Sequence, residues 1–411
     1  MMSETATPST GERRAAEAGP RGPRVRSDCW VGLTPQESGG IALEVSSTVE
    51  SSYGRSIRAA CEEGARALGI DHARIEVEDG GALPFVLMAR LEAAARRALP
   101  DLAGRWVPER TEAAPTPACR ERRRRSRLYL PGNQPKYMTN AGLHGPDAVI
   151  LDLEDSVAPE AKDAARILVR NALRQVDFRG AERTVRINPG SLGLADIDEV
   201  AGENVHMVLI PKVESAEDVL EVDERLRART EETVYLMPII ESARGVLQAP
   251  RIAAASERVA ALTIGLEDYT ADLGVPRTEQ GDESRWARSM IVHAARGAGV
   301  AAIDSVFSDV SDMDGLRRAV GEAKSMGFEG SGCIHPRQIR VVHEAFDPTP
   351  AEVERACRIV RAFRGASERG LGVVSLGSKM IDPPVVERAL QTLAQAVESG
   401  LLAADWEESE D

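Results

Sequence analysis

The sequence predicts an α/β protein built on a (β/α)8 TIM barrel, with a small α+β domain before the barrel and a helical extension after it. Eight short apolar runs, each followed by a helix-like stretch, recur between residues 127 and 336. The runs do not alternate between apolar and polar residues, which is typical of parallel strands buried on both faces. The chain has 411 residues, more than one compact domain usually holds. An open doubly wound sheet is the alternative arrangement of the same strands.

The predicted barrel strands are spaced so that a helix fits after each one. They occupy residues 127–132, 147–155, 183–189, 206–213, 234–242, 259–268, 301–309 and 330–336. An amphipathic helix at 349–366 and another helix after the loop 370–385 exceed what a barrel needs to close. They predict the helical extension.

Composition divides the rest of the chain. Apolar and polar residues alternate at 39–47 and 73–79, which predicts strands. At 52–68 and 82–99 apolar residues recur with a helical period, which predicts helices. Together these elements form the small domain. The predicted segments are a disordered tail (1–24), the small domain (25–100), a linker (101–124), the barrel (125–347) and the extension (348–411). The linker ends in an arginine run, 122–125, which is either solvated or contacts an anion at the barrel mouth.

Composition also excludes several classes of protein. The formal net charge of −14 argues against a nucleic-acid binder held by bulk charge, and no run of 18 apolar residues predicts a membrane span. The five scattered cysteines contain no CxxC pair, so they predict neither a disulfide framework nor a zinc site. The first 27 residues contain no apolar signal core. These features predict a cytoplasmic protein.

Charged residues gather at the C-terminal ends of the predicted strands, where barrel enzymes carry their chemistry. Glu241 ends the fifth strand and Asp268 ends the sixth, so two carboxylates meet at one mouth and suit Mg²⁺. The alternatives are helix N-caps or ion pairs. Arg186 lies inside the third strand, where a buried guanidinium needs an anion. That anion is either a substrate carboxylate or thioester oxygen, or a structural partner in Glu154 or Asp155.

Further polar residues surround the same mouth. Asp152 ends the second strand and Lys212 lies in the fourth, and with Glu154 and Asp155 they predict a supporting layer around the metal and substrate ligands. The chain shows no Ser/His/Asp or Cys/His arrangement, no Walker loop and no GxGxxG motif.

Seven segments of the predicted barrel and extension resemble one family. They are SRLYLPG, AVILDLEDSVAPEAKDAAR, VRINP, IIES, GLEDYTADLG, GFEGSGCIHPRQI and GLGVVSLGSKMIDPPVVERA. In this order they are similar to the HpcH/HpaI aldolase and citrate lyase family, specifically its citrate lyase β-subunit (citryl lyase) branch. The resemblance implies a Mg²⁺-dependent barrel that cleaves a citryl-type thioester to an acetyl thioester and oxaloacetate.

The resemblance also implies roles for single residues. Glu241 of IIES and Asp268 of GLED bind the metal, Glu241 also contacts substrate, and Arg186 binds substrate and acts in catalysis. Asp382 of the KMID segment acts in proton transfer, often at the site of a neighbouring subunit, which implies a homo-oligomer, a trimer or a multiple of one. One departure is Ser331, which stands where the family often has a lysine that contacts an anion.

Residues 27–98 resemble the γ-subunit of citrate lyase, an acyl carrier protein, through VESSYGRSI and ARIEVEDGGALPFVLMARLEAA. The malonate decarboxylase carrier is more distantly similar. The resemblance implies a covalent phosphoribosyl-dephospho-CoA arm on a serine, for which Ser27 is the nearest candidate. In these carriers the serine lies two residues before an aspartate, whereas here Arg26 has that place before Asp28. Pro84-Phe85 replaces the usual Asp-Cys pair.

The sequence thus predicts a carrier fused to its own lyase, joined by a linker that reaches about 25–30 Å as a coil. A carrier-bound substrate would need a separate acyl-transferase subunit as a partner. Two alternatives remain open. One is a lyase or thioesterase that acts on free malyl-CoA, citramalyl-CoA or β-methylmalyl-CoA. The other is a non-catalytic carrier or scaffold within a larger complex.

Overall fold

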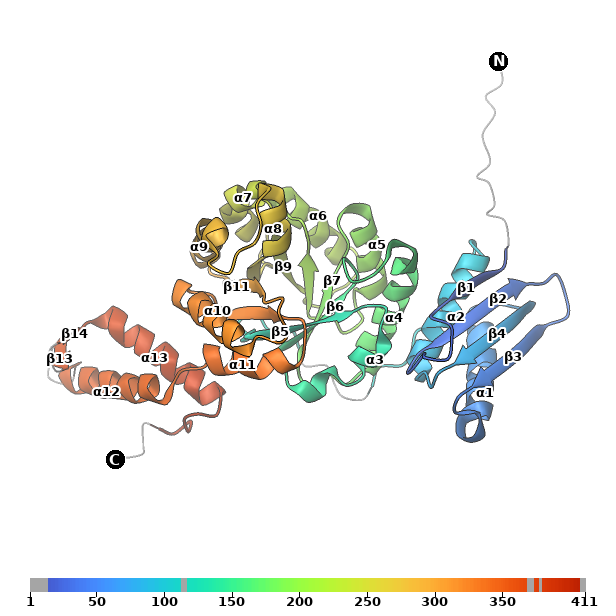
Figure 1. Cartoon of the computed structure of the whole chain (residues 1–411), viewed down its shortest axis with the longest axis horizontal. Helices are drawn as coiled ribbons and strands as arrows, with labels where there is room; N and C mark the ends of the chain where they lie inside the picture. Colours follow the sequence, from blue (N-terminus) through green and yellow to red (C-terminus); the bar gives the residue numbers. More distant parts are fainter. Residues whose placement is uncertain (1–13, 112–116, 368–372, 377–378, 407–411) are drawn as a thin grey trace, which may run out of the picture.

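The computed structural model describes residues 14–111, 117–367, 373–376 and 379–406. The barrel lies in the middle, with the small domain on one side and the C-terminal extension on the other (Figure 1). The eight strands close into a barrel, which confirms the predicted (β/α)8 fold and excludes the open doubly wound sheet.

A four-stranded sheet and two helices form the small α+β domain. Strand β2 is antiparallel to β1 and β4, and β3 is parallel to β4. The elements are β1 (Ala16–Ala18), β2 (Cys29–Pro35), β3 (Ile41–Ser47), α1 (Glu50–Ala67), β4 (Ala73–Asp79) and α2 (Pro84–Ala98). Alternate residues of β4, namely Ala73, Ile75 and Val77, are buried, as a strand with one covered face requires.

The sequence pattern misses the first two strands of this sheet. Strand β1 lies in the segment 1–24, and the predicted disordered tail is wrong for residues 16–18, which pair with residues 31–33 of β2. Because β1 is three residues long with Glu17 at its centre, it has no apolar pattern, and its partner strand stabilises it. The predicted tail up to residue 13 lies outside the described residues.

The barrel strands are all parallel and follow the order β10-β11-β12-β5-β6-β7-β8-β9. They are β5 (Ser126–Pro131), β6 (Ala148–Asp152), β7 (Glu182–Arg186), β8 (Met207–Ile210), β9 (Tyr235–Ile240), β10 (Ala261–Ile264), β11 (Ala301–Val306) and β12 (Gly330–Cys333). The helices are α3 (Pro135–Met138), α4 (Lys162–Gln175), α5 (Gly190–Val200), α6 (Ala216–Arg227), α7 (Ala243–Ala253), α8 (Leu266–Leu273), α9 (Asp282–Ala298), α10 (Met313–Met326) and α11 (Arg337–Phe346). Two 3-10 turns are η1 (Ala141–His144) and η2 (Pro159–Ala161).

Each strand lies within the stretch predicted for it or begins one residue earlier. Apolar side chains fill both faces of the closed sheet. Ile150 and Leu209 belong to the cluster inside the barrel, whereas their neighbours Val149 and Val208 pack with the surrounding helices. This two-sided burial explains why the strands read as continuous apolar runs.

The predicted linker is attached to the barrel along helix α4. Arg170 donates a hydrogen bond to the carbonyl oxygen of Trp106 at 2.6 Å, and Gln175 donates one to the carbonyl oxygen of Glu109 at 2.7 Å. The expectation of a flexible coil is therefore wrong for this part of the linker, because side chains of α4 bind its backbone. Residues 112–116 lie outside the described residues.

Helix α2 joins the small domain to the barrel, because it contacts β2 on one side and α4 on the other. At this junction Arg170 of α4 pairs with Glu92 of α2 at 2.7 Å and also with Glu199 of α5. All three side chains are buried. Removing one partner of a buried ion pair is strongly destabilising, so this cluster holds the small domain against the barrel.

The arginine run precedes β5 and therefore lies at the end of the barrel opposite to the strand C-termini. Arg124 is buried and bonds both carboxylate oxygens of Glu182 at 2.7 Å. Arg125 pairs with Asp147 at 2.8 Å and with Asp347 at 2.9 Å. Both sequence interpretations of the run, a solvated segment or an anion contact at the barrel mouth, are wrong for these two residues.

Two long helices and a hairpin form the C-terminal extension. They are α12 (Pro350–Ser367), β13 (Val374–Leu376), β14 (Lys379–Ile381) and α13 (Pro383–Glu398). The helices pack against each other around a separate core that includes Ile359, Leu393 and Trp406. The extension is attached to the barrel near Asp347, whose carboxylate accepts hydrogen bonds from Ser399 at 2.7 Å and from the Arg123 guanidinium at 2.9 Å.

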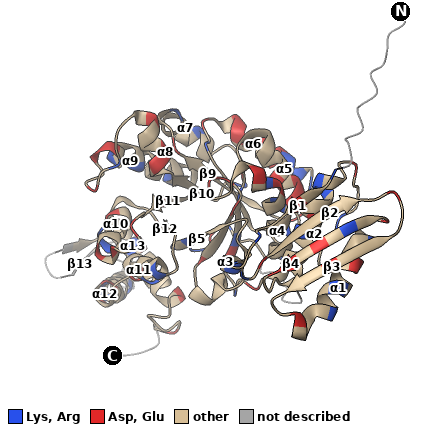
Figure 2. Cartoon of the chain, turned by 45° about the vertical axis from the view of Figure 1, so that its right-hand side comes forward, with Lys and Arg blue, Asp and Glu red and all other residues tan. Residues whose placement is uncertain are grey.

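Acidic and basic side chains are interspersed over both domains (Figure 2). Among the helices of the described ranges, none is both long and apolar enough to cross a membrane. All five cysteines are free thiols.

Candidate active site

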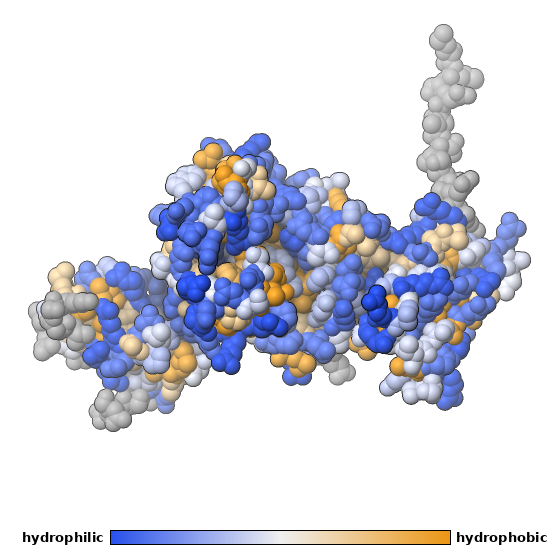
Figure 3. Space-filling model, in the orientation of Figure 1, coloured by the Kyte–Doolittle hydropathy of each residue, from blue (hydrophilic) through white to orange (hydrophobic). Residues whose placement is uncertain are grey.

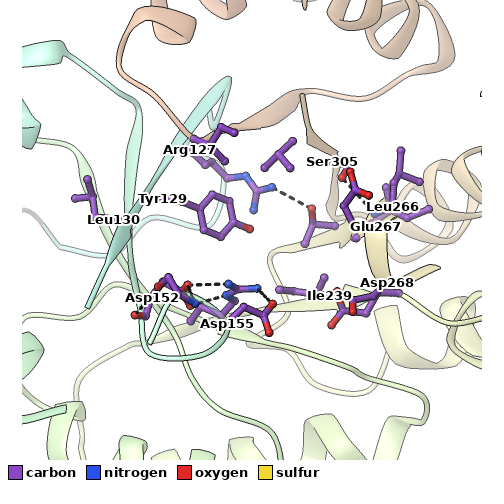
Figure 4. A pocket seen from close by; sticks show the side chains of 18 of the residues that line it. Arg127, Tyr129, Leu130, Asp152, Asp155, Ile239, Leu266, Glu267, Asp268 and Ser305 are labelled. Atoms are coloured by element: carbon purple, nitrogen blue, oxygen red, sulfur yellow. Dashed lines mark hydrogen bonds and ion pairs between the residues drawn. The ribbon is translucent and has the colours of Figure 1, made fainter. Parts of the chain in front are cut away.

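A pocket of about 440 Å³ opens at the C-terminal ends of the barrel strands. Residues of β5, β6, β7, β9, β10 and β11 and of the loops after them line it (Figure 4). The pocket brings together Asp152, Asp155, Arg186, Glu241 and Asp268, which the sequence places at separate strand ends. Closure of the barrel therefore turns residues distant in sequence into one site.

Glu241 directly follows β9, and its side chain is buried. One of its carboxylate oxygens accepts a hydrogen bond from the backbone N–H of Lys212 at 2.6 Å. Lys212 has a φ of +55°, a left-handed conformation that non-glycine residues rarely adopt. Gly265 leaves room for the carboxylate, since a Cβ there would lie 2.4 Å from a Glu241 carboxylate oxygen. The backbone around Glu241 is thus shaped to hold its carboxylate in one place.

Among the described residues, the Glu241 carboxylate forms no ion pair with a basic side chain, although the Arg186 guanidinium lies near enough to act against the rise of its pKa. Burial raises the pKa of the Glu241 carboxyl to about 8, and the neighbouring Asp268 carboxylate acts in the same direction. Among the described residues, the basic side chains of this wall pair instead with Asp152, Glu154 and Asp155. Two carboxylates that face one pocket without a counter-charge favour a bound cation.

The pocket lining and the ligand chemistry both fit Mg²⁺. Five carboxylate side chains but only two guanidinium groups line the pocket, so an anionic substrate is repelled unless positive charge is added. Within the described ranges, no three His, Cys, Asp or Glu side chains converge as a metal cluster. Mg²⁺ needs only one or two protein carboxylates, because water and substrate oxygens complete its octahedron. The pair Glu241 and Asp268 fits that requirement.

Arg186 is the last residue of β7 and lies among three carboxylates. Its guanidinium donates two hydrogen bonds to Asp152 at 2.6 and 2.7 Å. It also lies 2.8 Å from Glu154 and 3.2 Å from Asp155. Burial acts to raise the pKa of the Asp152 carboxyl, but the pairing with Arg186 holds it below its usual range. The structural pairs that the sequence left open are therefore present, and Arg186 also lines the pocket.

Lys212 contacts both Glu241 and the carboxylate group around Arg186. Its backbone N–H bonds Glu241, while its side-chain nitrogen lies 3.0 Å from the Glu154 carboxylate. Glu154 in turn contacts Arg186. The four residues form a continuous chain of contacts, and their roles in binding and catalysis stay predictions.

Five residues that the sequence singles out do not line the pocket. Glu154 and Lys212 contact the pocket residues Arg186 and Glu241, whereas Asp382, Ser331 and Ser27 have other surroundings. Asp382 caps the N-terminus of α13, where its carboxylate accepts a hydrogen bond from the Val385 N–H at 3.3 Å. The Ser331 hydroxyl donates to the Ser305 carbonyl oxygen at 2.7 Å and belongs to a neighbouring groove. Ser27 precedes β2 in the small domain and has a φ of +57°.

Ser27 nevertheless lies beside the contact between the small domain and the pocket rim. The next residue, Asp28, is buried and bonds Arg90 of α2 through both carboxylate oxygens at 3.0 and 2.8 Å. Arg90 also donates to the carbonyl oxygen of Asn133 at 3.1 Å. Asn133 comes two residues after Pro131, which lines the pocket.

Several residues inside the pocket were not predicted from the sequence, among them Arg127, Tyr129 and Thr263. Arg127 and Tyr129 alternate along β5 and share its inward face. A signal for Arg127 was present, because it is a charged residue within an apolar strand, the same feature that singles out Arg186.

A closed parallel barrel with a carboxylate-rich pocket at its strand C-termini defines a (β/α)8-barrel enzyme suited to a divalent cation. The family model of the HpcH/HpaI aldolase/citrate lyase family matches residues 125–336, and the chain belongs to this family. The model of the malonate decarboxylase delta subunit, an acyl carrier protein, matches residues 22–98. The resemblance inferred from the sequence is confirmed for both domains.

Several relatives match about two thirds of this chain. The citrate lyase subunit beta of Haemophilus influenzae is 40% identical over 281 residues, which cover 66% of this chain and 97% of the relative. The mitochondrial citramalyl-CoA lyase of Mus musculus is 33% identical over 293 residues, which cover 67% and 87%. The crystal structure of CitE from Mycobacterium tuberculosis with magnesium, acetoacetate and coenzyme A is 34% identical. It has a TM-score of 0.58 and covers 68% of this chain and 99% of that one.

Proposed function

We propose that the chain is a Mg²⁺-dependent carbon–carbon lyase that cleaves a citryl-type 3-hydroxyacyl thioester to an acetyl thioester and oxaloacetate. The observation that carries the proposal is the buried Glu241 carboxylate, which is held beside Asp268 and forms no ion pair with a basic side chain of the described residues. The related CitE was solved with magnesium and coenzyme A, and the relatives above are citrate and citramalyl-CoA lyases.

Glu241 and Asp268 would hold the cation. When bound, Mg²⁺ supplies Lewis-acid polarisation of the substrate hydroxyl and of the adjacent carboxylate. The backbone N–H of Lys212 holds the Glu241 carboxylate by a hydrogen bond, and the missing side chain of Gly265 leaves room for it. Arg186, fixed by its two bonds to Asp152, presents its positive charge to the pocket and stabilises negative charge on the acyl group.

The reaction is a retro-Claisen cleavage. A general base removes the proton of the tertiary hydroxyl, the bond between the hydroxyl-bearing carbon and the carbon next to the thioester breaks, and its electrons form a thioester enolate. The hydroxyl-bearing carbon becomes the ketone of oxaloacetate. The enolate then takes a proton at carbon and becomes the acetyl thioester, so the proton removed by the base can be returned.

Asp382 is the proposed proton-transfer residue, acting in the pocket of a neighbouring subunit. The extension that carries it projects away from its own barrel, and apolar residues lie on its surface (Figures 1 and 3). Met380, two residues from Asp382, is 66% exposed. The homo-oligomer, a trimer or a multiple of one, rests on the family resemblance, in which this aspartate reaches the site of a neighbouring subunit.

The small domain is the proposed carrier for the acyl group, with a phosphoribosyl-dephospho-CoA arm on Ser27. Its support is a pair of contacts next to Ser27. Arg90 bonds Asp28, and it also bonds Asn133, which lies two residues after the pocket residue Pro131. The arm would then reach the pocket of the same chain while the small domain stays in contact with the barrel, and the linker would not need to be flexible. A separate acyl-transferase subunit would load the arm, and the protein would work in the cytoplasm.

A second candidate is a lyase that acts on free CoA thioesters, with an unmodified small domain. It is favoured by Arg26, which has the place expected of the modified serine, and by the left-handed backbone of Ser27. Intact-protein mass from the native host, with peptide mapping of residues 14–60, decides between the two. A mass increment on Ser27 supports the carrier, whereas an unmodified chain that cleaves free citryl-CoA supports the second candidate.

The metal assignment has its own test. Isothermal titration of Mg²⁺ into the wild type, Glu241→Gln and the control Glu267→Gln measures binding without turnover. Glu267 lines the same pocket but is exposed and pairs with Arg277 at 2.8 Å. Binding is expected in the wild type and in the control and to be lost in Glu241→Gln. Equal binding by all three proteins contradicts the assignment.

A further inference from the structure

Arg127 is a charged side chain inside the barrel. It lies on β5, two residues before Tyr129, so both side chains point to the interior (Figure 4). Its side chain is 2% exposed, and it lines the same pocket as Glu241 and Asp268. The pocket is therefore lined by a buried cationic group, Arg127, as well as by carboxylates.

The side chains in direct contact with the Arg127 guanidinium are neutral. One terminal nitrogen lies 2.9 Å from the sulfur of Met237, and the other donates to the Thr263 hydroxyl at 3.0 Å. The Nε atom has no hydrogen-bond partner in the structure. Among the described residues, no carboxylate lies within ion-pair distance of this guanidinium, whereas the equally buried Arg124 and Arg170 each bond a glutamate.

An unpaired buried guanidinium is expensive for the fold. Transfer of a charged group out of water costs several kcal/mol unless a counter-charge and hydrogen bonds replace the lost solvation. Burial accordingly lowers the pKa of the Arg127 guanidinium. A substrate that brings an anion into the pocket would supply the missing charge and the missing acceptor for Nε.

The other basic group of the lining cannot play this part equally well. Arg186 already bonds Asp152 and contacts Glu154 and Asp155, so its charge is matched by the protein itself. Arg127 has only a neutral hydroxyl and a sulfur to hold it. Of the two guanidinium groups, Arg127 has more free capacity to bind an anionic substituent of the acyl group.

We propose that Arg127 binds the second carboxylate of the acyl group and thereby selects a thioester that yields a dicarboxylic keto acid. This inference rests on the proposed function. A citryl thioester carries a carboxymethyl substituent on the carbon that bears the hydroxyl, whereas a citramalyl thioester carries a methyl group there. The Thr263 hydroxyl orients the guanidinium, and the unpaired Nε provides a further donor toward the carboxylate.

The test compares two substrates in three proteins. The kcat/KM values for citryl-CoA and citramalyl-CoA are measured with Mg²⁺ for the wild type, Arg127→Met and Arg127→Lys. The wild type is expected to prefer citryl-CoA. Loss of a hydrogen bond between charged groups reduces kcat/KM for citryl-CoA by about 100-fold in Arg127→Met and by less in Arg127→Lys. The value for citramalyl-CoA is expected to change by less than about threefold. Equal loss on both substrates, no loss on citryl-CoA, or a wild type without preference overturns the proposal.

Two further readouts separate this proposal from a failure of the proposed function. Calorimetry with Mg²⁺ compares the binding of oxaloacetate and pyruvate, which requires no turnover. The wild type is expected to bind oxaloacetate more tightly, and Arg127→Met is expected to bind both equally. Equal binding by the wild type overturns the proposal, even if no thioester is cleaved. Thermal unfolding of Arg127→Met is expected at or above the wild-type temperature, because an apolar side chain replaces a buried unpaired charge. A marked drop would indicate a structural role and also overturn it.

Discussion

Replacing Arg170 with methionine removes the cation at the centre of the contact between the small domain and the barrel. Its guanidinium contacts Glu92 at 2.7 and 3.1 Å and donates to the Trp106 carbonyl oxygen at 2.6 Å, and it also pairs with Glu199. Glu92 is 0% exposed and Glu199 is 8% exposed. The variant Arg170→Met therefore removes the buried counter-charge that the two carboxylates share. Arg96 still pairs with Glu92 at 2.5 Å, and Arg105 still pairs with Glu199 at 3.0 Å.

The expected cost is about 3 kcal/mol, the lower end of the range for removing one partner of a buried ion pair, because Arg96 and Arg105 still pair with the two carboxylates. At roughly 2 cal/mol/K per residue over a folding unit of roughly 300 residues, about 3 kcal/mol corresponds to a fall in Tm of about 5 °C. Thermal unfolding followed by circular dichroism measures this fall. Hydrogen exchange should also become faster over residues 102–111, because the bond that holds Trp106 is lost.

Two variants serve as controls for Arg170→Met. Arg58→Met removes an exposed pair with Glu50 and should cost less than about 1 kcal/mol. The double variant Glu92→Gln/Arg170→Met removes one of the two buried carboxylates that lose Arg170 and should be more stable than Arg170→Met alone. If Arg170→Met unfolds within about 1 kcal/mol of the wild type and its linker exchanges no faster, this ion-pair cluster does not hold the two domains together.

Three further predictions concern the site and the fold. Gly265→Ala places a Cβ against the Glu241 carboxylate and should weaken Mg²⁺ binding by about tenfold or more in calorimetry, with the fold retained; unchanged affinity contradicts it. Burial lowers the pKa of His343, so stability should fall as pH drops from the unfolded value of about 6.5 through the lower folded value. In His343→Gln, the urea midpoint of unfolding should change less with pH over that range than in the wild type. An equal change in the two proteins contradicts this role of His343. Asp382→Asn should reduce kcat by about 100-fold, and mixing it with Glu241→Gln chains should restore turnover if subunits share sites.

The barrel was predictable from the sequence because its strands are buried on both faces. Ile150 faces the interior and Val149 faces the helices, so consecutive residues must both be apolar. Glu241 and Asp268 were predictable because a barrel carries its chemistry at strand ends. Strand β1 was not, because three residues without an apolar pattern form a strand only beside the partner that they pair with.

Other features depend on tertiary contacts that no local pattern encodes. The arginine run reads as a solvated segment, yet Glu182 and Asp347, which lie far away in the sequence, supply its counter-charges. The linker reads as a coil, but side chains of α4 bind its carbonyl oxygens. Arg127 was not predicted as a pocket residue because it is the second residue of β5, whereas the prediction considered residues at the C-terminal ends of the strands.

The most direct test of the proposed lyase activity is the product stoichiometry of citryl-CoA turnover. Acetyl-CoA and oxaloacetate are quantified with Mg²⁺, with EDTA, and in the Glu241→Gln variant. Equal amounts of both products from the wild type are expected, with turnover abolished by EDTA and absent in the variant while its circular dichroism spectrum is unchanged. Release of free CoA and citrate would indicate a thioesterase, and turnover that survives both EDTA and Glu241→Gln would contradict the assignment of the metal site.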